Sequence, residues 1–168
     1  MTWGNPPKFV NVDKPVAKKV TPEQLAKSGS EDGHQAAVFC WAASMLAQYP
    51  QLEWMHAIPN GGSRNIAEAT KLVATGTRSG VWDIFLPYPL WLHNIPSIDN
   101  PSGKYLMRKA GCYIEMKAPT ARNKKNDGLS NDQIKFGEYA EKAGYYCKVC
   151  YSWIEAKDAL IAYLEGKV

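Results

Sequence analysis

A glutamate and a lysine stand two residues apart in the stretch "YIEMKAP", residues 113–119. The apolar and aromatic residues around them predict a β-strand, and residues two apart on a strand project from the same face. Glu115 and Lys117 therefore place a carboxylate beside an ammonium group. Taken alone, the same spacing also fits an ordinary ion pair on an exposed strand face, so its meaning depends on the residues around it.

A second carboxylate, Asp83, lies in another predicted strand, "VWDIFLP" at residues 81–87. An unpaired charge in a buried strand is costly, so an acid in each of two strands needs a compensating partner. Consecutive strands often pair, and pairing would bring Asp83, Glu115 and Lys117 to one end of a sheet. Mg²⁺ suits such a pocket, because it binds carboxylates, water and substrate phosphate. Hydrolysis of a phosphodiester bond uses this combination of groups.

The segments that carry these residues alternate between helical and strand patterns. Helices are expected over residues 31–48, 66–75, 131–143 and 153–166, and strands over residues 52–59, 81–87, 113–119 and 145–151. The expected helix N-caps are Ser30, Asn65, Ser130 and Ser152, and the last three are followed three residues later by Glu68, Gln133 and Glu155. This order predicts an α/β fold, a single domain with a central mixed β-sheet flanked by helices.

Two segments stand outside this alternation. Residues 1–29 are rich in proline and lysine without an apolar period, which predicts an extended basic N-terminal arm that wraps the domain, reaches a partner or remains a mobile tail. Residues 88–108 contain many proline, asparagine and glycine residues, which predicts a long insertion with Trp91 and His93 exposed at its start. The domain itself is expected to span residues 30–168.

The composition of the 168 residues, 45% hydrophobic and 21% charged, fits one compact domain. No window is long and apolar enough for a membrane span, and a cytoplasmic protein without membrane contact is expected. The four cysteines are interpreted as free thiols, because the single C-x-x-C at 147–150 has no second pair to complete a zinc site. The net charge of +4 permits a polyanionic partner.

The motifs as a series resemble a known family. "SEDGHQ", "AIPNGGSRN", "GTRSGVWDIFLP", "CYIEMKAP", "GLSNDQIKF" and "AGYYCKVCYSWIEAKDAL" follow one another in the order found in the VRR-NUC nuclease domain of the PD-(D/E)XK superfamily. The resemblance covers about residues 30–164 and implies a restriction-endonuclease-like core. One departure is Trp82, which stands where the family usually has proline. The insertion at 88–108 is the other, and it would form a lid, a DNA-contacting loop or a dimer surface.

The resemblance implies a Mg²⁺ or Mn²⁺ site. It assigns the metal to Asp83, Glu115 and the backbone carbonyl of Met116, and it makes Lys117 the catalytic lysine. Whether one or two metal ions act stays open.

In the same family, the first helix also contributes a glutamate and a glutamine. Glu31 and Gln35 match them and share one helical face, with Glu31 as a further metal ligand and Asp32 as its rival in a shifted register. Gln133 matches the "LSxxQ" motif and is expected to reach the active site, although it is equally explained as a member of a capping box.

Further residues are expected to contact nucleic acid. They lie in the turn after the first strand, before the second strand and in the loop after the catalytic strand: Asn60, Gly61, Gly62, Arg64, Arg78, Arg122, Lys124 and Lys125. An ordinary tight turn and a solvated loop are the alternatives for these segments.

The function implied by the resemblance is that of a metal-dependent DNA endonuclease. Stand-alone members of the family are often carried by bacteriophages, and some act as homodimers on four-way (Holliday) junctions. Branched or duplex DNA and a second copy of the chain are thus the expected partners, inside a bacterial or phage-infected cell. The choice between DNA and RNA stays open. The alternative function is a nucleic-acid-binding module of nuclease descent that no longer cuts.

Overall fold

The computed structural model of the protein describes residues 20–59, 66–93 and 105–168. Its main sheet has four strands in the order β1-β2-β5-β6: β1 is His56–Ala57, β2 is Ile84–Leu86, β5 is Cys112–Met116 and β6 is Tyr146–Cys150. The sheet is mixed, because β5 runs antiparallel to β2 and parallel to β6. The expected α/β class with a mixed central sheet is therefore confirmed.

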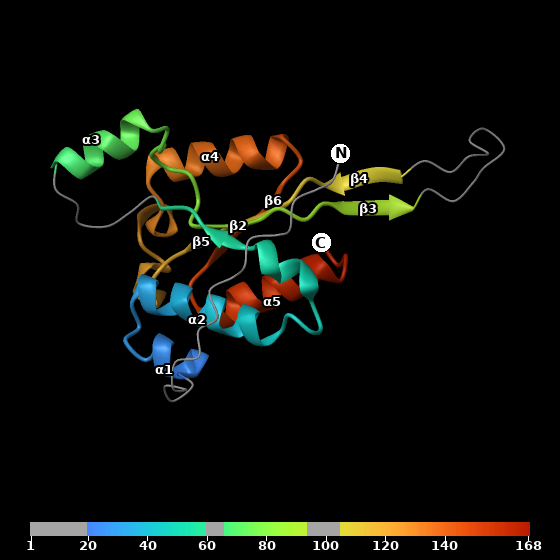
Figure 1. Ribbon diagram of the computed structural model, residues 1–168. Coiled ribbons are helices and arrows are strands. Elements are labelled where there is room, and N and C mark those ends of the chain that lie inside the picture. Colours follow the sequence, from blue (N-terminus) through green and yellow to red (C-terminus); the bar gives the residue numbers. More distant parts are fainter. Residues whose placement is uncertain (1–19, 60–65, 94–104) are drawn as a thin grey trace, which may run out of the picture.

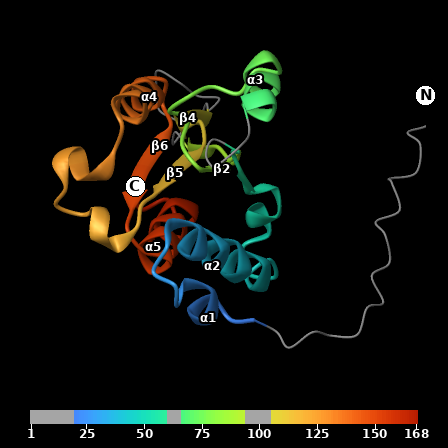
Figure 2. The same cartoon turned by 90° about the vertical axis from the view of Figure 1, so that its left-hand side faces the viewer.

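Helices lie on both faces of this sheet (Figure 1). Helices α2, Glu31–Ser44, and α5, Trp153–Leu164, pack on one side. Helix α4, Asn131–Lys142, lies on the opposite side with α3, Ile66–Ala74. Figure 2 shows the same layers from a second direction.

The two faces of β5 have different environments. Cys112, Ile114 and Met116 alternate along the strand, are almost fully buried and belong to the hydrophobic core shared with α2 and α5. The side chains between them, Tyr113 and Glu115, project from the opposite face. The carboxylate of Glu115 is thus carried on the face of the sheet that α4 covers.

The N-terminal segment differs from the expected extended arm in the part that the structure describes. Helix α1, Pro22–Ala26, begins at Thr21, whose hydroxyl accepts a hydrogen bond from the backbone N–H of Gln24. The Gln24 side chain in turn accepts from the backbone N–H of Thr21, which completes a capping box. Residues 1–19 of the expected arm lie outside the described residues.

The segment after α2 also corrects the expectation. The helix ends at Ser44, four residues early, and Pro50–Trp54 forms a 3₁₀ helix where a strand was expected to begin. Proline fits the first turn of a helix because its fixed φ is already helical and its missing N–H is not needed there. Only His56–Ala57 remains for β1.

The expected insertion at 88–108 contains a two-stranded sheet. Strands β3, Leu90–His93, and β4, Tyr105–Lys109, pair antiparallel and project away from the main sheet (Figure 1). Trp91 and Met107 are register partners, and both are more than half exposed. The exposure of Trp91 is as expected, while residues 94–104 lie outside the described part.

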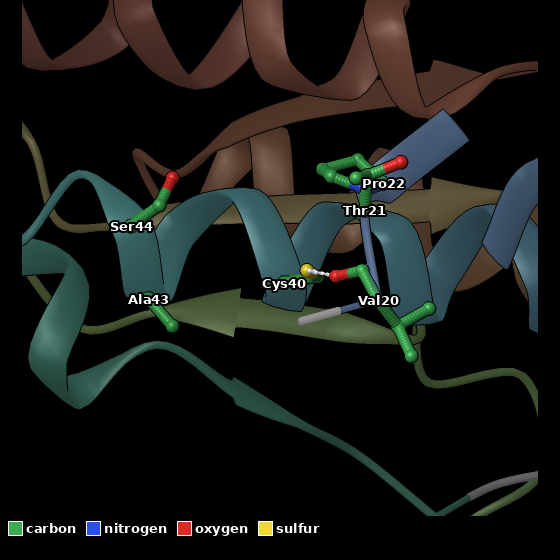
Figure 3. Close-up of a pocket in the computed structure, with 6 residues that line it drawn as sticks. All are labelled: Val20, Thr21, Pro22, Cys40, Ala43 and Ser44. Atoms are coloured by element: carbon green, nitrogen blue, oxygen red, sulfur yellow. Dashed lines mark hydrogen bonds between the residues drawn. The ribbon is translucent and has the colours of Figure 1, made fainter. Parts of the chain in front are cut away.

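A pocket of about 410 Å³ lies between the N-terminal segment and α2 (Figure 3). It is lined by Val20, Thr21, Pro22, Cys40, Ala43 and Ser44. The Cys40 thiol donates a hydrogen bond to the Val20 carbonyl across it. None of the lining residues is charged. Elsewhere in the described residues, no helix is long and apolar enough to cross a membrane.

Candidate active site

Glu115 and Lys117 form a buried ion pair at the carboxyl end of β5. The Lys117 ammonium nitrogen Nζ lies 2.5 Å from the Glu115 oxygen Oε1. Glu115 is fully buried and Lys117 is 7% exposed. The backbone N–H of Lys117 donates to the Cys150 carbonyl and so extends the β5–β6 ladder by one residue. The pair therefore does not lie on an exposed strand face, the alternative that its spacing left open.

Asp83 lies beside this pair because of the strand register. Ile84 is opposite Ile114, so the preceding residue, Asp83, lies level with Glu115. Its oxygen Oδ2 accepts a hydrogen bond of 2.9 Å from the backbone N–H of Met116. Asp83 itself immediately precedes β2. The predicted pairing of the two acid-bearing strands is thus found.

Glu31 reaches the same pair from the first residue of α2. Its oxygen Oε1 lies 3.8 Å from Lys117 Nζ, and its side chain is 42% exposed. The helix starts here because the Ser30 hydroxyl accepts a hydrogen bond from the Gly33 backbone N–H. Asp32 is exposed. Of the two rivals, Glu31 is the residue that contacts the lysine.

A close approach explains the glycine in the first turn of α2. A Cβ atom at position 33 would lie 2.7 Å from the Leu25 carbonyl oxygen. Helix α1 can therefore pack against the start of α2 only if this residue is Gly33. Gln35, one turn beyond Glu31, is half-buried on the same helix.

Gln133 joins the site from the first turn of α4. Its backbone N–H donates to the Ser130 hydroxyl, and its side-chain oxygen accepts from the Ser130 backbone N–H, so the expected capping box is present. The side-chain nitrogen Nε2 of the same residue donates to Glu115 Oε1. Both expected roles of Gln133 are therefore combined in one side chain.

The carboxyl groups of the site have raised pKa values. Burial, and then the neighbouring Asp83 carboxylate, raises the pKa of Glu115 to about 8. Burial also raises the pKa of Asp83 and that of Glu31. Burial alone would lower the pKa of Lys117, but the hydrogen bond and charge of Glu115 raise it overall. The lysine stays charged at neutral pH, and the acids resist losing their protons.

One atom of the site suits a hard divalent cation. The Glu115 oxygen Oε2 is buried and has no hydrogen-bond partner, which is a costly state for a carboxylate. A cation beside it would offset both this cost and the repulsion between Glu115 and Asp83. In the described residues, however, no group of three or more histidine, cysteine, aspartate or glutamate side chains is gathered closely enough to count as a metal centre. The observation in favour of the cation is therefore the single buried oxygen.

The residues expected to contact nucleic acid have different surroundings. Arg78, Lys124 and Lys125 are exposed. Arg122 forms an ion pair of 2.6 Å with Glu155, and its guanidinium lies over the Tyr151 ring. To bind a phosphate, Arg122 would have to give up or share Glu155. Four further residues, Asn60, Gly61, Gly62 and Arg64, fall outside the described residues, as does the expected cap Asn65.

Comparison with known proteins gives a likeness in fold. A solved structure described as "VRR_NUC domain protein" superposes with a TM-score of 0.55 at 18% sequence identity, covering 81% of this chain and 88% of that chain. The fold is similar to that of a VRR_NUC domain protein. No family model matches the sequence, and no curated protein matches it significantly. At this identity the likeness establishes the fold, while the PD-(D/E)XK relationship and the roles of individual residues stay predictions.

Trp82 is a residue whose contacts the sequence did not predict. It is 5% exposed, and its indole nitrogen Nε1 donates a hydrogen bond of 2.9 Å to the Gln133 carbonyl. A signal was present in Gly137, since a glycine inside a helix often marks a close contact. A Cβ atom there would lie 2.7 Å from the indole carbon Cζ2.

Proposed function

We propose that this protein is a metal-dependent DNA endonuclease that hydrolyses phosphodiester bonds. The observation that carries the proposal is the buried Glu115–Lys117 pair level with Asp83, in which one carboxylate oxygen has no partner. Buried acids with raised pKa values beside a lysine are frequent at catalytic sites and costly elsewhere. The likeness in fold to a VRR_NUC domain protein supports the same class of function.

In this proposal Asp83, Glu115, Glu31 and the Met116 carbonyl hold Mg²⁺ or Mn²⁺. Such a cation would supply Lewis-acid stabilisation of charge on the scissile phosphate and a bound water of lowered pKa. Lys117 orients that water or stabilises developing negative charge, which its raised pKa favours by keeping it protonated.

The remaining residues position the substrate and the acids. Gln133 holds Glu115 Oε1 through its amide, and Gln35 extends the same helical face as Glu31. The exposed side chains of Arg78, Lys124 and Lys125 bind the DNA backbone.

We further propose that the protein acts as a homodimer on branched DNA. A two-fold dimer would place two sites on the symmetric arms of a four-way junction. The projecting sheet of β3 and β4 carries an exposed pair, Trp91 and Met107, beside the basic Arg108. Exposed apolar groups of this kind are common at interfaces.

Cleavage of labelled four-way junction, flap and linear duplex DNA, with an RNA of matched sequence, tests the proposal. Each substrate is incubated with Mg²⁺, Mn²⁺ or EDTA. We expect metal-dependent cutting that Glu115→Ala abolishes and that Glu138→Ala, a change at an exposed glutamate of α4, leaves intact. Tight binding without cutting of any substrate would instead support the nucleic-acid-binding module. Light scattering of the free protein determines whether it is a dimer.

A further inference from the structure

Trp82 connects a sheet strand to the side chain that holds Glu115. It directly precedes Asp83, and its indole Nε1–H donates to the backbone carbonyl of Gln133. The side chain of Gln133 in turn donates to Glu115 Oε1. One residue of α4 thus separates the indole from the buried carboxylate.

The orientation of the Gln133 amide is fixed by its other end. Its oxygen Oε1 accepts a hydrogen bond of 2.9 Å from the Ser130 backbone N–H, so its nitrogen Nε2 must face the opposite way, toward Glu115. The amide cannot flip without losing both contacts. The position of the Gln133 amide therefore depends on the position of the first turn of α4.

The first turn of α4 is seated closely on residues 79–82. Ser79 Oγ donates to Asp132 Oδ2 at 3.0 Å, and a Cβ atom at position 80 would lie 2.5 Å from the Asp132 carbonyl carbon. Gly80 also has a φ of +82°, a conformation that glycine adopts without strain. On the next turn, Gly137 leaves room for the indole ring of Trp82.

We infer that Trp82 is a positioning residue of the active site. Its indole, held by the Gln133 carbonyl and accommodated by Gly137, sets the first turn of α4 so that the Gln133 amide stays on Glu115 Oε1. The other carboxylate oxygen, Oε2, is thereby left without a protein partner. The consequence for catalysis rests on the proposed nuclease function, whereas the positioning itself does not.

Nuclear magnetic resonance of the metal-free protein tests the positioning directly. The side-chain amide signal of Gln133 is assigned by its loss in Gln133→Ala. In Trp82→Phe and in Gly137→Ala, we expect this signal to move toward that of a solvated glutamine. In the control Trp54→Phe, which changes a tryptophan that is 72% exposed, it stays in place. An unmoved signal in the two site variants would overturn the inference.

A second variant separates the hydrogen bond from the bulk of the ring. Trp82 is replaced by benzothienylalanine, which has the shape of tryptophan but no N–H, and in a parallel sample by 5-fluorotryptophan, which keeps the N–H. We expect the first to shift the Gln133 amide signal and to lower kcat about two- to tenfold at unchanged KM, the effect of one lost hydrogen bond. The second should leave both the Gln133 amide signal and kcat at their wild-type values.

The two readouts distinguish the possible failures. If the unaltered protein cuts no nucleic acid, the proposed function fails, and the amide signal still decides the positioning. If the protein cuts and the benzothienyl variant keeps the wild-type kcat, the role of Trp82 at the active site is wrong.

Discussion

At the scale of single residues, the surroundings of Glu115 act on its pKa in opposite directions. Glu115 is fully buried and next to Asp83, which favours its protonated form, while Lys117 favours its ionised form. The pKa of Lys117 is itself raised, so the lysine stays protonated at neutral pH, whereas the pKa of Glu115, about 8, lies close to neutral pH. Two predictions follow from this balance.

The first concerns Lys117. We expect Lys117→Ala to lower cleavage about 10²- to 10⁴-fold, because the charge that faces the scissile phosphate is lost. Binding of Mn²⁺, measured by calorimetry, should persist, because the carboxylates remain. Lys142→Ala, a change at an exposed lysine near the end of α4, serves as the control. Cleavage at the wild-type rate in Lys117→Ala would exclude a catalytic role for the lysine.

The second concerns pH and Glu115. Because its pKa rises from 4.5 to about 8 on folding, the unfolded chain loses this proton first as pH rises. Without metal, the free energy of unfolding should therefore decrease between about pH 5 and pH 8, on the order of a few kcal/mol. Asp83 and Glu31 shift in the same direction and leave a residual slope.

The measurement is urea denaturation in EDTA across this pH range, with Glu115→Gln alongside the wild type. Glutamine cannot titrate, so the decrease should be clearly smaller in the variant. Parallel curves for the two proteins would show that Glu115 is not the group responsible.

At the scale of elements, the start of α4 combines helix capping with the active site. We expect Ser130→Ala to destabilise the protein by about 1 kcal/mol and also to lower cleavage. The backbone N–H of Gln133 then loses its acceptor, the Ser130 hydroxyl, so the first turn of α4 is held less firmly. Thr21→Ala removes the corresponding contact in the capping box of α1, where Thr21 lies beside Cys40 and Ser44 at the opposite end of α2 from Glu31, and should leave cleavage unchanged. Thermal unfolding and initial rates are compared for both variants. Equal cleavage by the two variants would show that the Ser130 cap does not affect the active site.

The elements also show how far the sequence could predict the structure. The shared face of Glu115 and Lys117 follows from strand periodicity, and the cap at Ser130 follows from local chemistry, so both were predictable. Gly137 indicated a close contact on α4, but its partner, Trp82, was not predictable, because packing between distant segments is a tertiary property. Leu52, Glu53 and Trp54 alternate apolar and polar as a strand does, but they belong to the 3₁₀ helix Pro50–Trp54, whose first turn suits the proline.

At the scale of the whole molecule, the basic groups predict how binding responds to salt. If Lys124 and Lys125 contact the DNA backbone, the dissociation constant should rise with salt, and the double change Lys124→Ala with Lys125→Ala should reduce the slope of log K against log salt by about two. Fluorescence anisotropy with labelled duplex at several salt concentrations measures both slopes. An unchanged slope would place the DNA on another face.

The arrangement of layers explains where the acids come from. Glu115 lies on β5, and Asp83 lies immediately before the adjacent strand β2. Glu31 begins α2 in one helical layer, and Gln133 lies in α4 in the other; Figure 2 shows the two layers. The site therefore lies at the carboxyl end of the inner strand β5, next to the first turns of α2 and α4. Only the correctly packed molecule brings these four side chains together.

The order of β5, α4 and β6 along the chain has a consequence for synthesis. These three elements follow one another over residues 112–150, a segment that contains Glu115, Lys117 and Gln133, so their contacts join residues that are near one another in the chain. Glu31 and Asp83 precede this segment in the chain and leave the ribosome before it. In a nascent chain, Glu31, Asp83 and Glu115 have thus all been made before Gln133, the amide partner of Glu115, and before β6, the parallel neighbour of β5. The last contacts of the acids therefore form only after residue 150 has been made.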